Sequence, residues 1–290
     1  MADGDRPNPI TTDTEPTNAE NAMAADSPLI DLTAFDIAVI IPCKDEAVAI
    51  GGMVEELHHL LPSAKIYVYD NNSTDGTAEV AAKAGAIVRA ETRQGKGFVV
   101  RRMFADIDAD IYMMVDGDNT YDIHAAPRLI STLVTQGLDM VNGSRRAVQE
   151  EAYRPGHAMG NKAMSEIVRR LFGNGFRDIF SGYRIFSRRF VKSFPVMSRG
   201  FEIETELTVH ALSLEMPFTE VPTDFKDRPT GSESKLRTYT DGTRILWTII
   251  NLLRQERPMR LFALVSAVLA VLALILTYPL LLTFLDTGLV

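Results

Sequence analysis

Short apolar runs alternate with segments of helical periodicity from residue 35 onward. Five runs rich in β-branched and other apolar residues predict strands: Ile37–Ile41, Ile66–Tyr69, Ala86–Val88, Ile111–Val115 and Met140–Val141. Between them, apolar residues recur at helical spacing in four segments: Ala47–Leu61, Thr74–Ala84, Gly97–Ala105 and Ala125–Gln136. Strands that alternate with helices predict an α/β fold, with a mostly parallel sheet that has helices on both faces.

Polar groups follow four of the predicted strands, and three of these groups are acidic. They are Pro42–Glu46, Asp70–Ser73, Asp116–Asp118 and Asn142–Arg145. In sheets of this kind, ligands bind outside the carboxyl ends of the strands. The sequence therefore predicts a binding site at this edge of the sheet.

The C-terminal third has a different pattern, in which helices predominate. Phe201–Glu215 reads as a helix, and Asp241–Arg257 reads as a second helix with a single polar stripe and a wide apolar arc. So wide an arc favours an amphipathic helix in a membrane interface (241–257). Packing beneath the preceding domain is the alternative.

Leu261–Leu285 contains no formal charge over 25 residues. A helix of this length can span a bilayer, so we expect a transmembrane helix (261–285), with a buried helix of a soluble protein as the alternative. Arg254, Arg257 and Arg260 precede the segment and no base follows it, which predicts that the preceding domain lies in the cytoplasm. Whether a longer product continues into a further membrane helix is left open.

Charge and composition narrow the functional classes. The formal net charge of -8 argues against a nucleic-acid partner, and a single cysteine, Cys43, excludes an intramolecular disulfide and a Cys-based zinc site. Residues 1–36 hold eight acids and one base, so most of the charge lies in a polar N-terminal stretch. We expect residues 1–34 to form a disordered acidic tail, with a docking tail as the alternative, and residues 35–240 to form the α/β domain.

Asp116-Gly117-Asp118 is the strongest candidate for chemistry. Two carboxylates that flank a small residue at a strand end offer the hard oxygen ligands that Mg²⁺ and Mn²⁺ prefer beside phosphates. Basic residues in loops could hold the phosphates themselves: Lys96, Arg145, Arg146, Arg154, Arg184, Arg228 and Lys235. The sequence has no Walker loop and no G-x-G-x-x-G after a strand, which weakens the ATPase and dinucleotide oxidoreductase alternatives.

Five motifs together resemble glycosyltransferase family 2, and within it the dolichol- or polyprenyl-phosphate sugar transferases. They are Ile40–Glu46, Asp70–Thr77, Asp116–Asp118, Gly143–Arg145 and Ser181–Arg184. The resemblance covers about residues 37–257 and implies a GT-A fold, a Rossmann-like nucleotide-sugar domain. It implies Mg²⁺ or Mn²⁺ as cofactor, and a nucleotide sugar, a polyprenyl phosphate lipid and the cell membrane as partners, with the catalytic domain on the cytoplasmic face. A homo-oligomer is left open.

The family's motifs carry roles onto individual residues of this chain. By resemblance, Pro42, Asp45 and Glu46 hold the nucleotide, Asp70 lies near the base, and Lys96 lies beside the nucleotide. Asp116, Gly117 and Asp118 match the metal motif, whose two acids bind the ion and, with Arg145, are the expected catalytic residues. Three basic residues match groups near the donor and acceptor phosphates: Arg145, Arg228 and Lys235.

Three departures from the family pattern affect this assignment. Lys44 stands where relatives often have an aromatic residue, and Thr120 stands where some have a metal-binding Gln, so water is expected to complete the metal shell. Arg228 and Lys235 are one residue further apart than in many relatives. A missing Q-x-x-R-W motif favours transfer of a single sugar over processive synthesis.

The expected activity is inverting, metal-dependent transfer of one hexose from a GDP-mannose or UDP-glucose type of donor to a dolichyl or undecaprenyl phosphate. A glycolipid or polysaccharide acceptor is the first alternative. A non-catalytic nucleotide-sugar-binding scaffold is the second.

Overall fold

A single mixed sheet forms the centre of the molecule. The computed structural model describes residues 30–147, 155–173, 175–229, 231, 235 and 238–288. In this part of the chain seven strands lie in the order β3-β2-β1-β4-β6-β5-β7. Their bounds are β1 (Ile37–Cys43), β2 (Lys65–Asp70), β3 (Ile87–Ala90), β4 (Ile111–Met114), β5 (Met140–Ala147), β6 (Arg184–Ser187) and β7 (Phe218–Phe225). Only β6 runs against its neighbours β4 and β5; the other described pairings are parallel.

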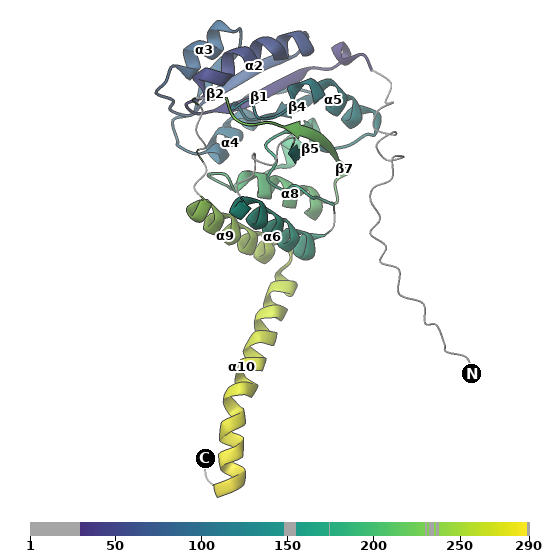
Figure 1. The fold of residues 1–290 in the computed structure, drawn as a ribbon. Coiled ribbons are helices and arrows are strands. Elements are labelled where there is room, and N and C mark those ends of the chain that lie inside the picture. The colour runs from purple at the N-terminus through teal and green to yellow at the C-terminus, as the bar shows by residue number, and fades with distance from the viewer. Residues whose placement is uncertain are drawn as a thin grey trace, which may run out of the picture.

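The helices cover both faces of this sheet (Figure 1). Their bounds are α2 (Ala47–Leu60), α3 (Thr77–Lys83), α4 (Lys96–Asp106), α5 (Ala126–Thr135), α6 (Pro155–Phe172), α7 (Arg188–Ser193), α8 (Ile203–Ser213), α9 (Thr238–Glu256) and α10 (Pro258–Thr287). Two short 3-10 helices, Leu32–Ala34 and Ile123–Ala125, precede β1 and α5.

Alternation along the strands builds two hydrophobic cores, one on each face. In β1, Ile37, Val39 and Ile41 point into a core shared with α2, α3 and α5. Ala38 and Ile40 point the other way, into a core shared with α4 and α6 to α9. Successive side chains of a strand face opposite sides, so a strand buried on both faces reads as a continuous apolar run.

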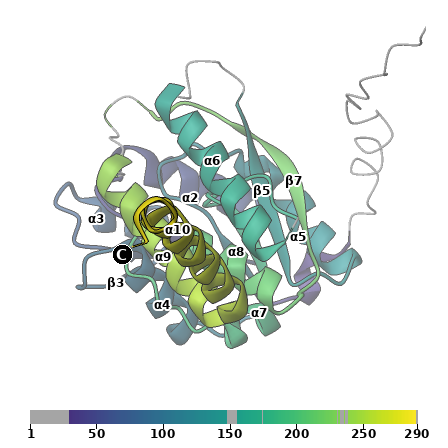
Figure 2. The same cartoon turned by 90° about the horizontal axis from the view of Figure 1, so that it is seen from below.

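The helices α6 and α9 lie side by side where α10 leaves the globular part (Figure 2). Arg260 near the start of α10 donates to the carbonyl of Leu171 at the end of α6, at 2.8 Å. None of the hydrophobic residues of α10 is buried. The candidate membrane span therefore projects from the globular domain at the end where α6 and α9 lie.

Most predicted elements are present, with corrections at their limits. Strand β5 extends to Ala147, well beyond the predicted Val141, and α9 begins at Thr238 rather than Asp241. The sequence did not indicate four elements: α6, β6, α7 and β7. Leu32–Ala34, assigned to the disordered tail, form a 3-10 helix capped by Asp31, because its carboxylate accepts from the backbone N–H of Thr33. Residues 1–29 of that tail lie outside the described residues.

Helix α9, which covers most of the 241–257 segment, packs against the domain with one side, and its place in a membrane interface stays a prediction. Its Ile245, Ile249, Leu252 and Leu253 are buried in the core against the domain. On its outer side, three apolar side chains remain exposed: Leu246 at 41%, Trp247 at 64% and Ile250 at 39%. The helix packs beneath the domain with one side and leaves apolar side chains uncovered on the other.

Candidate functional site

The loops after β1 and β2 are tied together at the carboxyl edge of the sheet. The backbone N–H of Asp45 donates to Ser73 Oγ at 2.8 Å, and the Asp45 carboxylate accepts from the backbone of Thr74 at 2.8 Å. Asp75 accepts from the backbone N–H of Ala47, in the first turn of α2, at 2.9 Å. Side chains of the Asp70–Thr77 motif therefore accept an N–H group in the first turn of α2 that has no partner within the helix, and they hold the Asp45–Glu46 loop in place.

Asn71 links this edge to the glycine-rich loop that carries Lys96. Its amide donates to the carbonyls of Glu91 and Arg93, both at 2.8 Å, and its oxygen accepts from the backbone N–H of Gly95 at 2.7 Å. Gly95 has a φ of 135° and lies against the Arg199 carbonyl, where a Cβ would come within 2.2 Å. Only glycine has room for this φ beside the carbonyl. The close contact packs the start of α4 against the Arg199 backbone.

Lys96, in the first turn of α4, lies between two carboxylates. Its ammonium contacts Asp116, after β4, and Glu204, in the first turn of α8. The Lys96 side chain is 9% exposed and that of Glu204 5%. Burial would lower the pKa of Lys96, but the carboxylates of Asp116 and Glu204 outweigh it and hold the pKa above its usual value. The ammonium is therefore charged at neutral pH.

Asp118 is held from two sides. Its Oδ1 accepts from the backbone and hydroxyl of Thr120, at 3.1 and 2.7 Å. Its Oδ2 pairs with Arg228 at 2.6 Å, while Arg228 also lies 3.6 Å from Glu46. Burial, and then repulsion from Asp116, raise the pKa of Asp118 despite the attraction of Arg228. Two neighbouring carboxylates are thus close enough to repel each other, which is the situation that a bound cation relieves.

Lys235 joins the same group of charges from the segment after β7. Its ammonium donates to the Asp45 carbonyl at 3.2 Å and lies 3.9 Å from a Glu46 carboxylate oxygen. The structure therefore brings together seven of the predicted residues: Asp45, Glu46, Lys96, Asp116, Asp118, Arg228 and Lys235. These residues come from loops far apart in the sequence.

Glycines set the shape of the Asp116–Asp118 turn. A Cβ on Gly117 would lie 2.4 Å from the sulfur of Cys43, and a Cβ on Gly182 would lie 2.2 Å from Asp116 Oδ2. Pro42, beside Cys43 in β1, pairs with Tyr69 of β2 and is buried, and its carbonyl oxygen would lie 3.6 Å from the same Cβ on Gly117. Pro42 and Gly117 thus lie close together at this turn, and their predicted contacts with the nucleotide stay predictions.

Asp70 ends β2, and the described residues leave one of its carboxylate oxygens without a hydrogen bond. Its Oδ2 accepts from the backbone N–H of Ser73 at 3.2 Å, whereas Oδ1 is buried and has no hydrogen-bond partner among the described residues. A buried acceptor without a partner carries a desolvation cost. A ligand with an N–H group would relieve it.

Arg145 pairs with an acid outside the predicted set. Its guanidinium makes two hydrogen bonds of 2.7 Å to Asp178 and lies over the ring of Phe225, 5.6 Å from the centroid. Burial acts to raise the pKa of Asp178, but the charge and hydrogen bonds of Arg145 lower it overall. The described contacts thus tie Arg145 to Asp178, a partner that the sequence did not suggest.

The described residues offer two protein carboxylates to a divalent ion, not a complete set of protein ligands. Among them no group of three or more His, Cys, Asp or Glu side chains is placed to hold a metal. Asp116 and Asp118 would bind an ion through carboxylate oxygens, with other oxygen ligands from water and phosphate, the pattern usual for Mg²⁺. The residues fit such an ion because they are adjacent acids of like charge.

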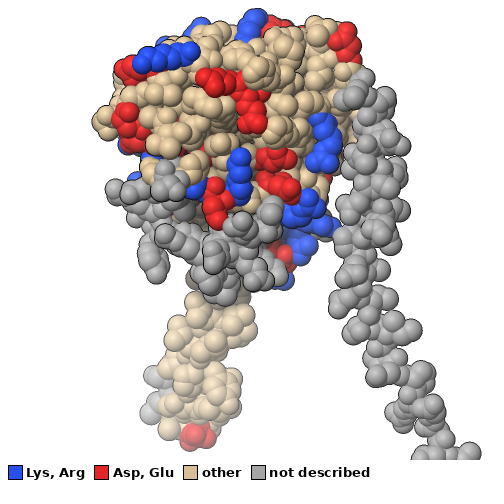
Figure 3. Space-filling model, turned by 45° about the horizontal axis from the view of Figure 1, so that its top comes forward, with Lys and Arg blue, Asp and Glu red and all other residues tan. Residues whose placement is uncertain are grey.

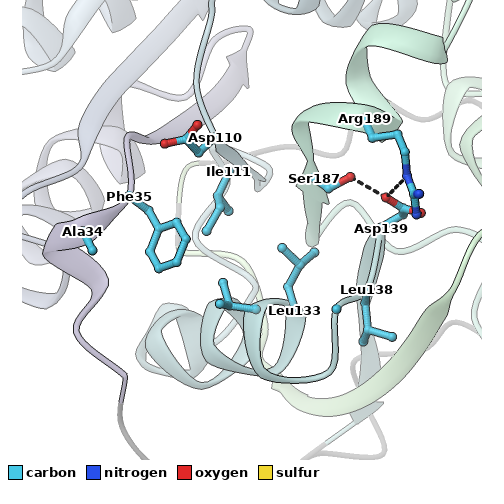
Figure 4. Close-up of a pocket in the computed structure, with 11 residues that line it drawn as sticks. Ala34, Phe35, Asp110, Ile111, Leu133, Leu138, Asp139, Ser187 and Arg189 are labelled. Atoms are coloured by element: carbon cyan, nitrogen blue, oxygen red, sulfur yellow. Dashed lines mark hydrogen bonds and ion pairs between the residues drawn. The ribbon is translucent and has the colours of Figure 1, made fainter.

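A separate groove lies at the opposite edge of the sheet (Figure 4). It has a volume of about 630 Å³ and is lined by residues at the start of β4 and the end of β6, among them Ile111 and Ser187. There the buried Asp139 accepts from Ser187 and Arg189, at 2.7 and 2.9 Å. None of the predicted site residues lines this groove.

Comparison with known proteins gives a consistent result. The model of glycosyl transferase family 2 matches residues 38–194. The chain is 34% identical to the glycosyltransferase AglJ of Haloferax volcanii over 232 residues, which cover 78% of this chain and 75% of the relative. It is 25% identical to a dolichyl-phosphate hexose transferase of the same organism over 229 residues, which cover 79% of this chain and 99% of the relative.

Among solved structures, a glucosyl-3-phosphoglycerate synthase from Mycobacterium tuberculosis has the same fold. That enzyme was crystallised with Mn²⁺, uridine diphosphate and glucosyl-3-phosphoglycerate. The TM-score is 0.60 at 20% sequence identity, with 84% of this chain and 86% of that chain covered. The likeness confirms the predicted α/β GT-A fold, here with a mixed seven-stranded sheet and one long apolar C-terminal helix.

Proposed function

We propose that this chain, which belongs to glycosyltransferase family 2, transfers a single hexose from a nucleotide diphosphate sugar to a polyprenyl phosphate at a membrane surface. One observation carries the proposal: the acids and cations gathered at the sheet edge lie on a chain whose α10 is long and apolar enough to cross a bilayer. The dolichyl-phosphate hexose transferase among the relatives supports the lipid acceptor.

The donor half of the proposal rests on the charges around Asp116 and Asp118. Lys96, Arg228 and Lys235 supply three cations, the chemistry that a diphosphate requires. Oδ1 of Asp70, for which the described part of the chain provides no hydrogen-bond donor, suits an N–H of the nucleotide base. Mg²⁺ or Mn²⁺, held by Asp116 and Asp118, would stabilise the negative charge that develops on the leaving diphosphate. The related fold crystallised with Mn²⁺ and uridine diphosphate supports this choice of cofactor.

The acceptor half follows from the chemistry of a phosphate monoester. With a second pKa near 6, such a group is largely ionised at neutral pH and is already a nucleophile. The protein then needs cations to bring two anionic reactants together, rather than a strong general base. Lys235 and Arg228 reach the site from the segment after β7 and are suited to this task.

The location at a membrane surface is supported by α9 and α10. Helix α10 has 30 residues and contains an 18-residue window with a mean hydropathy of 2.6. At 1.5 Å per residue it is about 45 Å long, which exceeds the roughly 30 Å hydrocarbon core. Charged side chains of both signs are scattered over the visible globular surface, whereas α10 is nearly free of them (Figure 3). Exposed Leu246, Trp247 and Ile250 on α9 suit the lipid interface, and Arg254 at its end suits the cytoplasmic face.

A transfer assay tests the proposal directly. Purified full-length protein with Mn²⁺ should move radiolabelled sugar from one of a panel of GDP- and UDP-sugars into an organic-extractable, mild-acid-labile product when a polyprenyl phosphate is present. Omission of the lipid should abolish that product. Label found only in polymer would favour a polysaccharide acceptor, and label released only as free sugar would contradict transfer to lipid.

Arg228 provides a second prediction, because it pairs with Asp118 in the absence of donor. Arg228→Gln should strengthen Mn²⁺ binding without nucleotide several-fold, since Asp118 loses a competing cation. The same change should raise the KM for the sugar nucleotide about tenfold, since the diphosphate loses a guanidinium partner. Calorimetric titration and initial-rate kinetics measure the two effects.

The control for this prediction is Arg188→Gln, which removes an exposed arginine paired with Asp108 at the far edge of the sheet. It should change neither quantity. Weaker Mn²⁺ binding in Arg228→Gln without nucleotide would contradict the competition.

A further inference from the structure

Glu204 is a buried acid that has no role in the proposed sugar transfer as described so far. It lies in the first turn of α8, with its side chain 5% exposed, and its charge partner in the structure is the ammonium of Lys96. Burying a carboxylate is costly unless it is paired. Lys96 already has a counter-charge in Asp116, so a second acid is not needed to neutralise it.

The position of Lys96 between two acids suggests what the second acid does. An ammonium has three N–H donors and can serve two carboxylates at once. If Asp116 alone neutralised the buried ammonium, a metal ion at Asp116 would leave Lys96 without a close partner inside the protein, and that loss would oppose metal binding. With Glu204 present, Lys96 would keep one carboxylate partner when Asp116 binds the ion.

We propose that Glu204 is a positioning residue that holds the ammonium of Lys96 in place and thereby makes Asp116 available to the metal and the donor diphosphate. This inference rests on the proposed nucleotide-sugar function and assigns a role to a residue outside the predicted motif set. Glu204 acts through Lys96 and needs no contact with substrate.

The test is a titration of Mn²⁺ into the full-length protein saturated with uridine diphosphate or guanosine diphosphate, followed by calorimetry. Glu204→Gln keeps the size of the side chain and removes its charge. It should weaken Mn²⁺ binding about tenfold, because Lys96 then depends on Asp116 alone. The matched control is Asp139→Asn, which neutralises an equally buried, arginine-paired acid in the groove of Figure 4 and should leave Mn²⁺ binding unchanged.

A double variant separates positioning from a general structural effect. In a Lys96→Gln background there is no ammonium to hold, so adding Glu204→Gln should cause no further loss of Mn²⁺ affinity. If Lys96→Gln and Glu204→Gln each weaken Mn²⁺ binding and the double variant shows the product of the two losses, the inference is overturned. Wild-type Mn²⁺ affinity in Glu204→Gln would also overturn it. An equal loss in Asp139→Asn would overturn it too, because the effect would then be one of stability.

The titration contains no lipid, so its outcome is separate from that of the acceptor assay. A wild-type protein that binds nucleotide and Mn²⁺ but transfers no sugar to polyprenyl phosphate would contradict the proposed acceptor, and the coupling of Glu204 to Lys96 would still be measured. A wild-type protein that binds neither nucleotide with Mn²⁺ would contradict both proposals.

Discussion

Asp118→Asn is expected to lower sugar transfer roughly a thousandfold while the protein stays folded. Asn keeps the shape of Asp and can still accept from Thr120, but it cannot offer a charged oxygen to a divalent ion. The change also removes one counter-charge of Arg228, which lies 2.6 Å from Asp118 and keeps Glu46 at 3.6 Å. Initial rates of lipid-linked product and calorimetric titration of Mn²⁺ with nucleotide should both show the loss.

The stability of this variant follows from the pKa of Asp118, which burial and then Asp116 raise above the ordinary value of 3.8. A carboxyl whose pKa is raised on folding binds its proton more tightly in the folded state, so stability falls as the pH rises above the ordinary pKa. At neutral pH the ionised Asp118 therefore does not stabilise the fold, and Asn should give a Tm equal to or above that of wild type.

Asp122→Asn is the matched control for Asp118→Asn. Asp122 lies four residues further on and caps a 3-10 helix by accepting from His124, a task that Asn performs equally well. This variant should retain wild-type transfer. Full activity in Asp118→Asn, or a collapse of its folded structure in thermal unfolding, would contradict the role given to the acid.

The sequence predicted the carboxyl edge of the sheet well because the signals there are local. Runs such as Ile37–Ile41 are buried on both faces and end in polar groups, and parallel strands bring those groups to one edge. The GT-A fold and the grouping of Asp116, Asp118 and Lys96 followed from this pattern and from the family motifs. Such information is contained in a few consecutive residues.

The two strands that the sequence did not indicate, β6 and β7, contain residues that are unusual in strands. Strand β6 begins with Arg184, which is fully buried because its guanidinium donates to the carbonyls of Ser181 and Ile179. Strand β7 contains Pro222 and two acids, a composition that usually marks a loop, yet it lies at the end of the sheet where proline is tolerated. Neither strand shows the apolar run that identified the others.

Glu204 was missed for a related reason. Glu204 lies two residues from Glu202 and from Glu206, so it shares a helix face with neither of them, and such acids usually lie in solvent. In the structure all three are buried: Glu202 and Glu206 accept backbone N–H groups and Glu204 pairs with Lys96. The partners of Glu202 and Glu206 lie in the segment just before α8, whereas Lys96 lies on another helix, so the spacing of the acids gives no sign of the pair with Glu204.

Gly182→Ala is expected to lower transfer about a hundredfold without removing any charged group. Gly182 is not among the glycines with a positive φ, so its backbone accommodates alanine. The added methyl group, however, would lie 2.2 Å from Oδ2 and 2.6 Å from Cγ of Asp116. The flexible carboxylate must move aside, and a displacement of about 1 Å at a reacting centre can cost about a hundredfold in rate. Mn²⁺ titration with nucleotide should show weaker binding in parallel.

Gly52→Ala is the matched control, because an added Cβ there meets nothing within 4 Å and the residue lies within α2. It should retain wild-type transfer and gain about 0.5 to 1 kcal/mol of stability from the higher helix propensity of alanine. A crystal structure of Gly182→Ala should show the Asp116 carboxylate turned away from Lys96. If that carboxylate keeps its place and transfer is unchanged, the close packing of Gly182 against Asp116 has no bearing on the reaction, and the acid need not be held as tightly as the wild-type geometry implies.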